Sequence, residues 1–282
     1  MRPRRSLTPV AVALAAVAIA LAGCGGDGGN KKSNRAQAYS GAAAGDRGDF
    51  KVAFDSPQSE DERAVEQVLR DPNGADVEGL ASGLNEALSL PHDITIKIDH
   101  GDPSPYFDPE RKEIHLQYDF VLYGDQVYTD LYPDDSPEES LNRDASLVDF
   151  VLMHEIGHSL IDAYDIPVLG KEEDAVDALA TVMMTQFVDG GDDIAVAGAD
   201  FFGALAGQKG TNFSDSDFWD EHSLDKQRAY AIICWVAGSS DEDLKAVADA
   251  RLIGEDRLQS CPDEYQQKVR SWFRVLEPHI KA

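Results

Sequence analysis

The stretch VDFVLMHEIGHSLID, residues 148–162, is the segment around which the rest of the chain is predicted to fold, because it sets H-E-x-x-H inside an apolar helical run. His154 and His158 are four residues apart, so on a helix their rings project from one face, one turn apart. Two imidazole nitrogens placed in this way can reach the same metal ion. The sequence SPEE at residues 136–139 is a typical start for such a helix.

Glu155, which lies between the two histidines, supplies the chemistry that a hydrolytic metal site needs. A carboxylate in this position can take a proton from a metal-bound water, whose pKa the metal lowers from about 15.7 to about 7. The alternative is a buried helix whose histidines only make local hydrogen bonds. The motif predicts a zinc hydrolase if the chain provides a third ligand.

The N-terminus has the layout of an export signal. Residues 1–5, MRPRR, are basic, an apolar run covers residues 10–21, and residues 21–24 read Leu-Ala-Gly-Cys. We therefore expect residues 1–23 to be a signal peptide that is cleaved before Cys24. Leu-Ala-Gly-Cys resembles the bacterial lipobox, whose cysteine becomes the lipidated N-terminus; the alternative is ordinary secretion with an incidental cysteine.

This resemblance implies a lipoprotein in the bacterial cell envelope, anchored to a membrane on its extracytoplasmic side. Residues 24–49 contain many small and polar residues and few large apolar ones, so they are predicted to form a flexible tether. Residues 50–282 are then expected to fold as one domain.

The net charge and the cysteine content limit the partners and ligands that this chain is expected to bind. The formal net charge is −27, which makes nucleic acid an improbable partner and leaves the lipid anchor as the membrane attachment. Besides Cys24 the chain has two cysteines, Cys234 and Cys261, which an exported protein is expected to join in a disulfide. Thiolate metal ligation is the weaker alternative, because neither cysteine belongs to a C-x-x-C pair.

Hydrophobic periodicity predicts an α+β fold in which a small β-sheet lobe is followed by a mainly helical lobe, with the H-E-x-x-H helix between them. Strands are predicted at residues 94–98 and 113–118 because apolar and polar residues alternate there. The predicted helices, besides the one with the motif, cover residues 59–69, 75–88, 171–184, 193–206 and 262–280. A further helix is predicted to open at Glu221 and His222 and to carry Tyr230, Ile232, Ile233 and Trp235.

The helix predicted at residues 171–184 begins with acidic residues that could approach the two histidines. HEIGH at residues 154–158, followed by E-x-x-x-D on the next helix, resembles the gluzincin metallopeptidases. More narrowly, HEIGH, the segment GKEEDAVD at 170–177 and EHSLDKQR at 221–228 are similar to a bacterial family of zinc metallopeptidase-like proteins whose substrates are unknown. The resemblance spans most of residues 94–261 and implies a zincin-like fold.

This resemblance implies that His154, His158 and Glu173 bind one zinc ion per chain and that Asp177 orients a histidine. The chain departs from the thermolysin-like pattern, because only 14 residues separate His158 from Glu173. Asp177 therefore competes for the role of third ligand, and Asp162 is a poorer third choice. The alternative for the acidic run is a solvated helix start, since acids there also suit the helix dipole.

His222 is the candidate for stabilising an oxyanion across the cleft, a role that gluzincins often give to a histidine or tyrosine. The alternative is a capping or ion-paired surface histidine. Arg228 and Asp225 are expected to form a structural ion pair. His92, His100 and His115 are each expected to be surface or packing residues.

Together these observations predict a lipid-anchored enzyme that hydrolyses peptide bonds of a peptide or protein substrate with a zinc-activated water, with Glu155 as the base. The alternative is a catalytically silent binding lipoprotein with a zincin fold.

Overall fold

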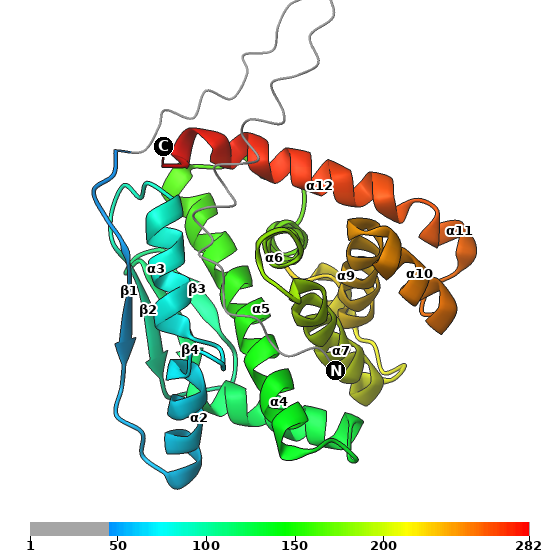
Figure 1. The fold of residues 1–282 in the computed structure, drawn as a ribbon, viewed down its shortest axis with the longest axis horizontal. Coiled ribbons are helices and arrows are strands. Elements are labelled where there is room, and N and C mark those ends of the chain that lie inside the picture. Colours follow the sequence, from blue (N-terminus) through cyan, green and yellow to red (C-terminus); the bar gives the residue numbers. More distant parts are fainter. Residues whose placement is uncertain (1–44, 282) are drawn as a thin grey trace, which may run out of the picture.

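The computed structural model describes residues 45–281 and has the predicted α+β architecture, with a small sheet followed by a mainly helical region (Figure 1). The predicted signal peptide, Cys24 and most of the predicted tether lie outside the described residues. Near the start of the described part, the backbone N–H groups of Arg47 and Gly48 donate to the carbonyl of Leu90. Within residues 45–281, none of the helices is both long and apolar enough to cross a membrane.

The sheet has four strands in the order β1-β2-β4-β3, namely β1 (Phe50–Phe54), β2 (Ile94–Asp99), β4 (Glu113–Gln117) and β3 (Tyr106–Asp108). β1, β2 and β4 are parallel, and the short β3 pairs with β4 in the antiparallel sense. In β2 the alternating residues Ile94, Ile96 and Ile98 are fully buried, which explains why alternation predicted this strand. β1 was not predicted, because Ala53 interrupts the alternation of apolar and polar residues, and β3 was not predicted, because it has only three residues.

Helices α2 (Glu60–Arg70) and α3 (Val77–Ala87) connect β1 to β2, close to their predicted positions. Helix α4 (Tyr118–Leu131) was missed, because it follows β4 without a loop and is rich in aromatic and β-branched residues that have low helix propensity. Tertiary packing overrides that propensity: Tyr128 is buried and its hydroxyl donates to the carbonyl of Ala197.

Helix α5 (Pro137–Tyr164) carries the H-E-x-x-H motif and lies between the sheet lobe and the other long helices (Figure 1). It begins at a capping box, in which the Ser136 side chain accepts from the Glu139 N–H and the Glu139 carboxylate accepts from the Ser136 N–H. It ends at Asp165, which adopts a left-handed conformation with φ of 51°. Most of its second half is buried, which fixes the motif in the core of the molecule.

The helical lobe follows, with α6 (Glu172–Phe187), α7 (Gly191–Lys209), α8 (Asp215–Trp219), α9 (Asp225–Ser239), α10 (Asp241–Ala250), α11 (Glu255–Leu258) and α12 (Cys261–Leu276). Cys234 and Cys261 form the predicted disulfide, which ties α9 to the start of α12. Helix α12 runs along one side of both lobes (Figure 1), and after it the Lys281 N–H donates to Ala87 in the sheet lobe.

Gly157, inside the motif, lets α5 and α6 approach each other closely. A Cβ atom at this position would lie 2.8 Å from Cγ1 and 2.9 Å from Cβ of Val176 on α6. Because that is closer than such atoms normally come, any side chain at residue 157 would push the two helices apart.

We therefore expect Gly157→Val to lower the free energy of unfolding by about 1 to 3 kcal/mol, as overpacking of a core does. Urea unfolding followed by circular dichroism measures this change. Gly203→Ala is the matched control, since Gly203 also lies within a helix but has open space around its Cβ position. The control should be neutral or stabilising by about 0.5 to 1 kcal/mol. An unchanged midpoint in Gly157→Val would contradict the close approach.

Candidate metal centre

The two motif histidines point from α5 toward the first turns of α6. Their ring centroids are 5.0 Å apart, and His154 is only 6% exposed. The two helices are antiparallel here, so that His158 lies next to Glu172 and Glu173, and His154 lies next to Asp177. Because the connection at residues 165–171 is short, the acidic first turn of α6 lies against the face of α5 that carries the two histidines.

Glu173 lies between both histidines. Its Oε2 is 3.1 Å from His154 Nε2, and its Oε1 is 3.4 Å from His158 Nε2. Ligand atoms of His154, His158 and Glu173 all lie within 4.8 Å of one another. Two imidazole nitrogens and a carboxylate oxygen are a common ligand set of catalytic zinc. Zinc–ligand bonds of about 2.0 to 2.1 Å in tetrahedral geometry put ligand atoms about 3.4 Å apart, so the residues fit such an ion.

Asp177 occupies the other side of His154. Its Oδ1 lies 2.8 Å from His154 Nδ1, and the side chain is almost fully buried. Arg228 on α9 donates to both carboxylate oxygens, from Nε at 2.7 Å and from Nη2 at 2.8 Å. Glu173 thus contacts the Nε2 atoms of His154 and His158, whereas Asp177 contacts the Nδ1 atom of His154. Asp162, the third candidate, accepts a hydrogen bond from Lys112 at 2.7 Å.

The partner of Arg228 corrects one prediction. Arg228 was expected to pair with Asp225, three residues earlier on the same helix, but it pairs with Asp177. The reason is burial: Arg228 is 8% exposed, and a buried guanidinium requires a buried partner. Asp225, at the start of α9, is only partly buried, whereas Asp177 is fully buried beside Arg228.

Hydrogen bonds among the side chains of the site stabilise their charged forms. Burial opposes protonation of His154, but its bonds to Asp177 and Glu173 outweigh this and raise its pKa. Burial also acts against His158, whose pKa is nevertheless raised to about 9 by Glu173, Glu155 and Glu172. For Glu173, burial favours the neutral form, but hydrogen bonds from His154, His158 and His222 hold its pKa far below the usual range.

Glu155 differs from the other acids of the site. It is 6% exposed, and among residues 45–281 its carboxylate makes no hydrogen bond or ion pair. Burial raises its pKa above the ordinary value, although the neighbouring histidines act in the opposite direction. A raised pKa makes this carboxylate a stronger proton acceptor than an ordinary glutamate.

His222 contacts Glu173 from the loop that precedes α9. Its Nε2 lies 3.1 Å from Glu173 Oε2 and its Nδ1 lies 3.1 Å from Asp220 Oδ1, while the side chain is 49% exposed. Glu221 and His222 were expected to open a helix, but α9 begins at Asp225 and His222 stands on the preceding loop. Lys171 holds this loop by donating to the backbone carbonyls of Asp220 and His222.

These groups line a cleft of about 900 Å³. Its walls come from α5, from the acidic start of α6, from the loop that carries His222, and from the edge strand β3 with the residues before it. His154, Glu155, His158, Glu173 and His222 therefore share one space that is open to solvent.

The remaining histidines of the sheet lobe stand apart from this group. His115 is buried, with its Nδ1 2.6 Å from Asp99 Oδ2 and the Tyr106 ring stacked on it. His100 lies 3.4 Å from Glu62 and beside the Tyr118 ring.

Two contacts were not predicted, Glu172 with His158 at 2.8 Å and Lys171 with the loop carbonyls. The only sign of these contacts in the sequence is that Lys171 and Glu172 belong to the acidic start of the predicted helix.

Comparison with protein families matches residues 54–276 to the family described as "Putative metallopeptidase". No curated protein and no solved structure matches the chain. The family match covers well over half of the chain and includes all residues of the site described above, so this protein belongs to that metallopeptidase family.

Proposed function

We propose that the protein hydrolyses peptide bonds with a single zinc ion held by His154, His158 and Glu173. The observation that carries this proposal is the convergence of these three side chains, which offer ligand atoms within 4.8 Å of one another beside a buried carboxylate. The family match supports peptide hydrolysis as the reaction class. A zinc ion bound there would polarise the peptide carbonyl and lower the pKa of the attacking water.

The side chains around the three ligands would carry the proton transfers and the binding. Glu155 accepts the proton of the attacking water and returns it to the leaving amine, a task that its raised pKa favours. His222 donates a hydrogen bond to the oxygen of the scissile carbonyl, since its Nε2 reaches Glu173 Oε2, the oxygen that also contacts His154. Asp177, fixed by Arg228, holds His154 with its Nε2 directed at the ligand group.

Removing a ligand should remove zinc. We expect the purified protein to carry one zinc per chain, His154→Ala, His158→Ala and Glu173→Ala to carry none, and Asp177→Asn to bind about 10 to 100-fold more weakly, as loss of an orienting residue does. Elemental analysis after dialysis measures the content, and circular dichroism checks the fold. Full zinc in Glu173→Ala with none in Asp177→Asn would transfer the third-ligand role to Asp177. Full zinc in His154→Ala would refute the metal site.

Removing the base should separate zinc binding from hydrolysis. Glu155→Gln is expected to keep its zinc and to lose about 100-fold or more of the cleavage of a peptide library, because the carboxylate takes the proton but does not hold the ion. Chelation should abolish wild-type cleavage, and added zinc should restore it. Wild-type protein that binds zinc without cleaving any peptide would favour the catalytically silent binding lipoprotein instead.

We also propose that the enzyme is exported and anchored in a bacterial membrane through a lipid on Cys24. The support is the layout of residues 1–24, together with a disulfide of the kind that exported proteins keep. Wild type should partition into the detergent phase on phase separation, and Cys24→Ser into the aqueous phase. If both remain aqueous, the anchor is absent, whereas the metal site is unaffected by that result.

A further inference from the structure

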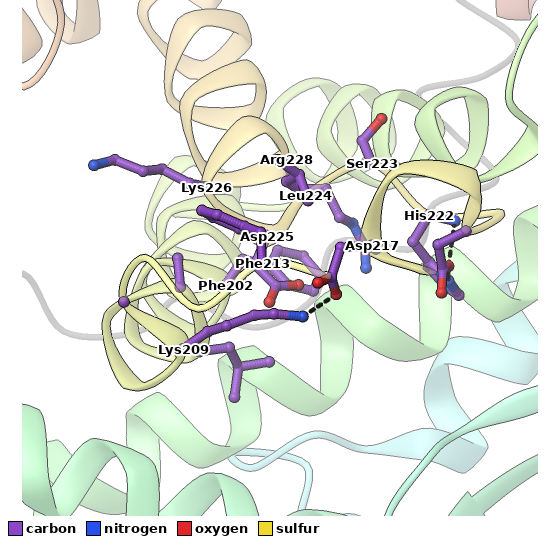
Figure 2. A pocket seen from close by; sticks show the side chains of 14 residues that line it. Phe202, Lys209, Phe213, Asp217, His222, Ser223, Leu224, Asp225, Lys226 and Arg228 are labelled. Atoms are coloured by element: carbon purple, nitrogen blue, oxygen red, sulfur yellow. Dashed lines mark hydrogen bonds and ion pairs between the residues drawn. The ribbon is translucent and has the colours of Figure 1, made fainter. Parts of the chain in front are cut away.

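A second cavity of about 340 Å³ opens beside the metal cleft, between α7, the loop with α8 and the start of α9 (Figure 2). We call it the side pocket. Asp220 and His222 line both the side pocket and the metal cleft, so a chain bound in the cleft can extend a side chain into it. Its apolar wall consists of Phe202, Leu205, Ala206, Phe213 and Leu224.

The cations that line the side pocket already have partners. Lys209 forms an ion pair with Asp217 across the cavity (Figure 2). Arg228 is taken by the bidentate bond to Asp177 and lies 3.7 Å from the centre of the Phe202 ring. Lys226 points away from the cavity in Figure 2 and lies 5.9 Å from the Tyr230 ring. None of these three cations therefore forms a direct ion pair with a further acid in the cavity.

Asp225 is the acid that remains. Within residues 45–281 its carboxylate makes no hydrogen bond or ion pair, while Asp220 is 3.1 Å from His222 and Asp217 has Lys209. Burial raises the pKa of the Asp225 carboxyl and outweighs the opposite effect of the charges on Arg228, Lys209 and His222, none of which pairs with it directly. The side pocket thus combines an apolar side with one carboxylate, Asp225, that has no direct hydrogen-bond or ion-pair partner among residues 45–281.

We propose that the side pocket binds a lysine or arginine side chain of the substrate and that Asp225 selects it. This rests on the proposed peptidase function. The long side chains of these residues have an aliphatic stem that fits against Phe202, Leu205 and Phe213, and a cationic end that can pair with Asp225. An apolar substrate residue would fill the same space but leave the carboxylate partly desolvated without a partner.

Charge outside the side pocket acts in the same direction. Glu172 and Glu221 line the metal cleft, and the whole chain carries a net charge of −27. Such a field raises the local concentration of cationic peptides and slows the approach of acidic ones. The field gives a general preference for basic peptides, whereas Asp225 gives a preference at one substrate position.

The test measures binding rather than turnover. Zinc-loaded Glu155→Gln protein is titrated with fluorescent hexapeptides of alanine and serine that carry one lysine, norleucine or glutamate at each position in turn. At the position that enters the side pocket, lysine should bind about tenfold or more tightly than norleucine at low ionic strength, the effect of one charge-assisted hydrogen bond. Adding Asp225→Asn should reduce this ratio to about twofold or less. Adding Asp225→Lys should make glutamate the preferred residue.

Asp241→Asn is the matched control, because Asp241 is also the first residue of a helix and its loss changes the net charge equally. It should leave the ratio unchanged, and melting curves check that all variants fold. A ratio near one in Glu155→Gln protein, a ratio that survives Asp225→Asn, or no binding of any peptide would each overturn the assignment. Hydrolysis by wild type is scored separately: a lysine preference that depends on Asp225 in a protein without hydrolysis would refute only the peptidase function.

Discussion

The buried contact of Asp177 with Arg228 and His154 joins three helices, and the geometry of the site depends on it. Asp177 is 1% exposed, so its charge must be compensated inside the protein. Arg228 from α9 supplies two hydrogen bonds and His154 from α5 a third, which hold the pKa of Asp177 at about 2 although burial opposes the charge. Removal of one partner of such a pair typically costs about 3 to 5 kcal/mol, which makes the arrangement of α5, α6 and α9 costly to change.

The same contact sets the charge balance of the centre. Glu155, Glu173 and Asp177 bring three carboxylates into a largely buried space, and Arg228 neutralises one of them. The raised pKa values of His154 and His158 allow protons on these histidines to compensate the other two. A divalent cation would supply the same charge from the position of those protons, so binding would release them. The acids around His154 and His158 thus form a group that suits a bound cation.

The sequence predicts the parts of the site that are local and misses those that depend on distant segments. HEIGH gives the two histidines and Glu155 because helical spacing alone places them. The bond between Arg228 and Asp177 spans 51 residues, and no local pattern distinguishes it from the expected pair with Asp225. Helix α4 was missed for a similar reason, since the packing of Tyr118 and Tyr128 outweighs the low helix propensity of that segment.

The segment KEED, residues 171–174, shows how much of one short pattern only the structure can assign. An acidic helix start is equally well explained by the helix dipole, so the sequence could not distinguish solvated from functional acids. In the structure each of the four side chains has its own set of contacts in the cleft or with the loop that carries His222. Lys171 holds the loop of His222, Glu172 contacts His158, Glu173 lies between the histidines, and Asp174 accepts from Ser223. The close approach of α5 and α6 at Gly157 brings this turn within reach of His158. The turn can therefore supply a ligand and hold the opposite wall of the cleft only as long as that approach is kept.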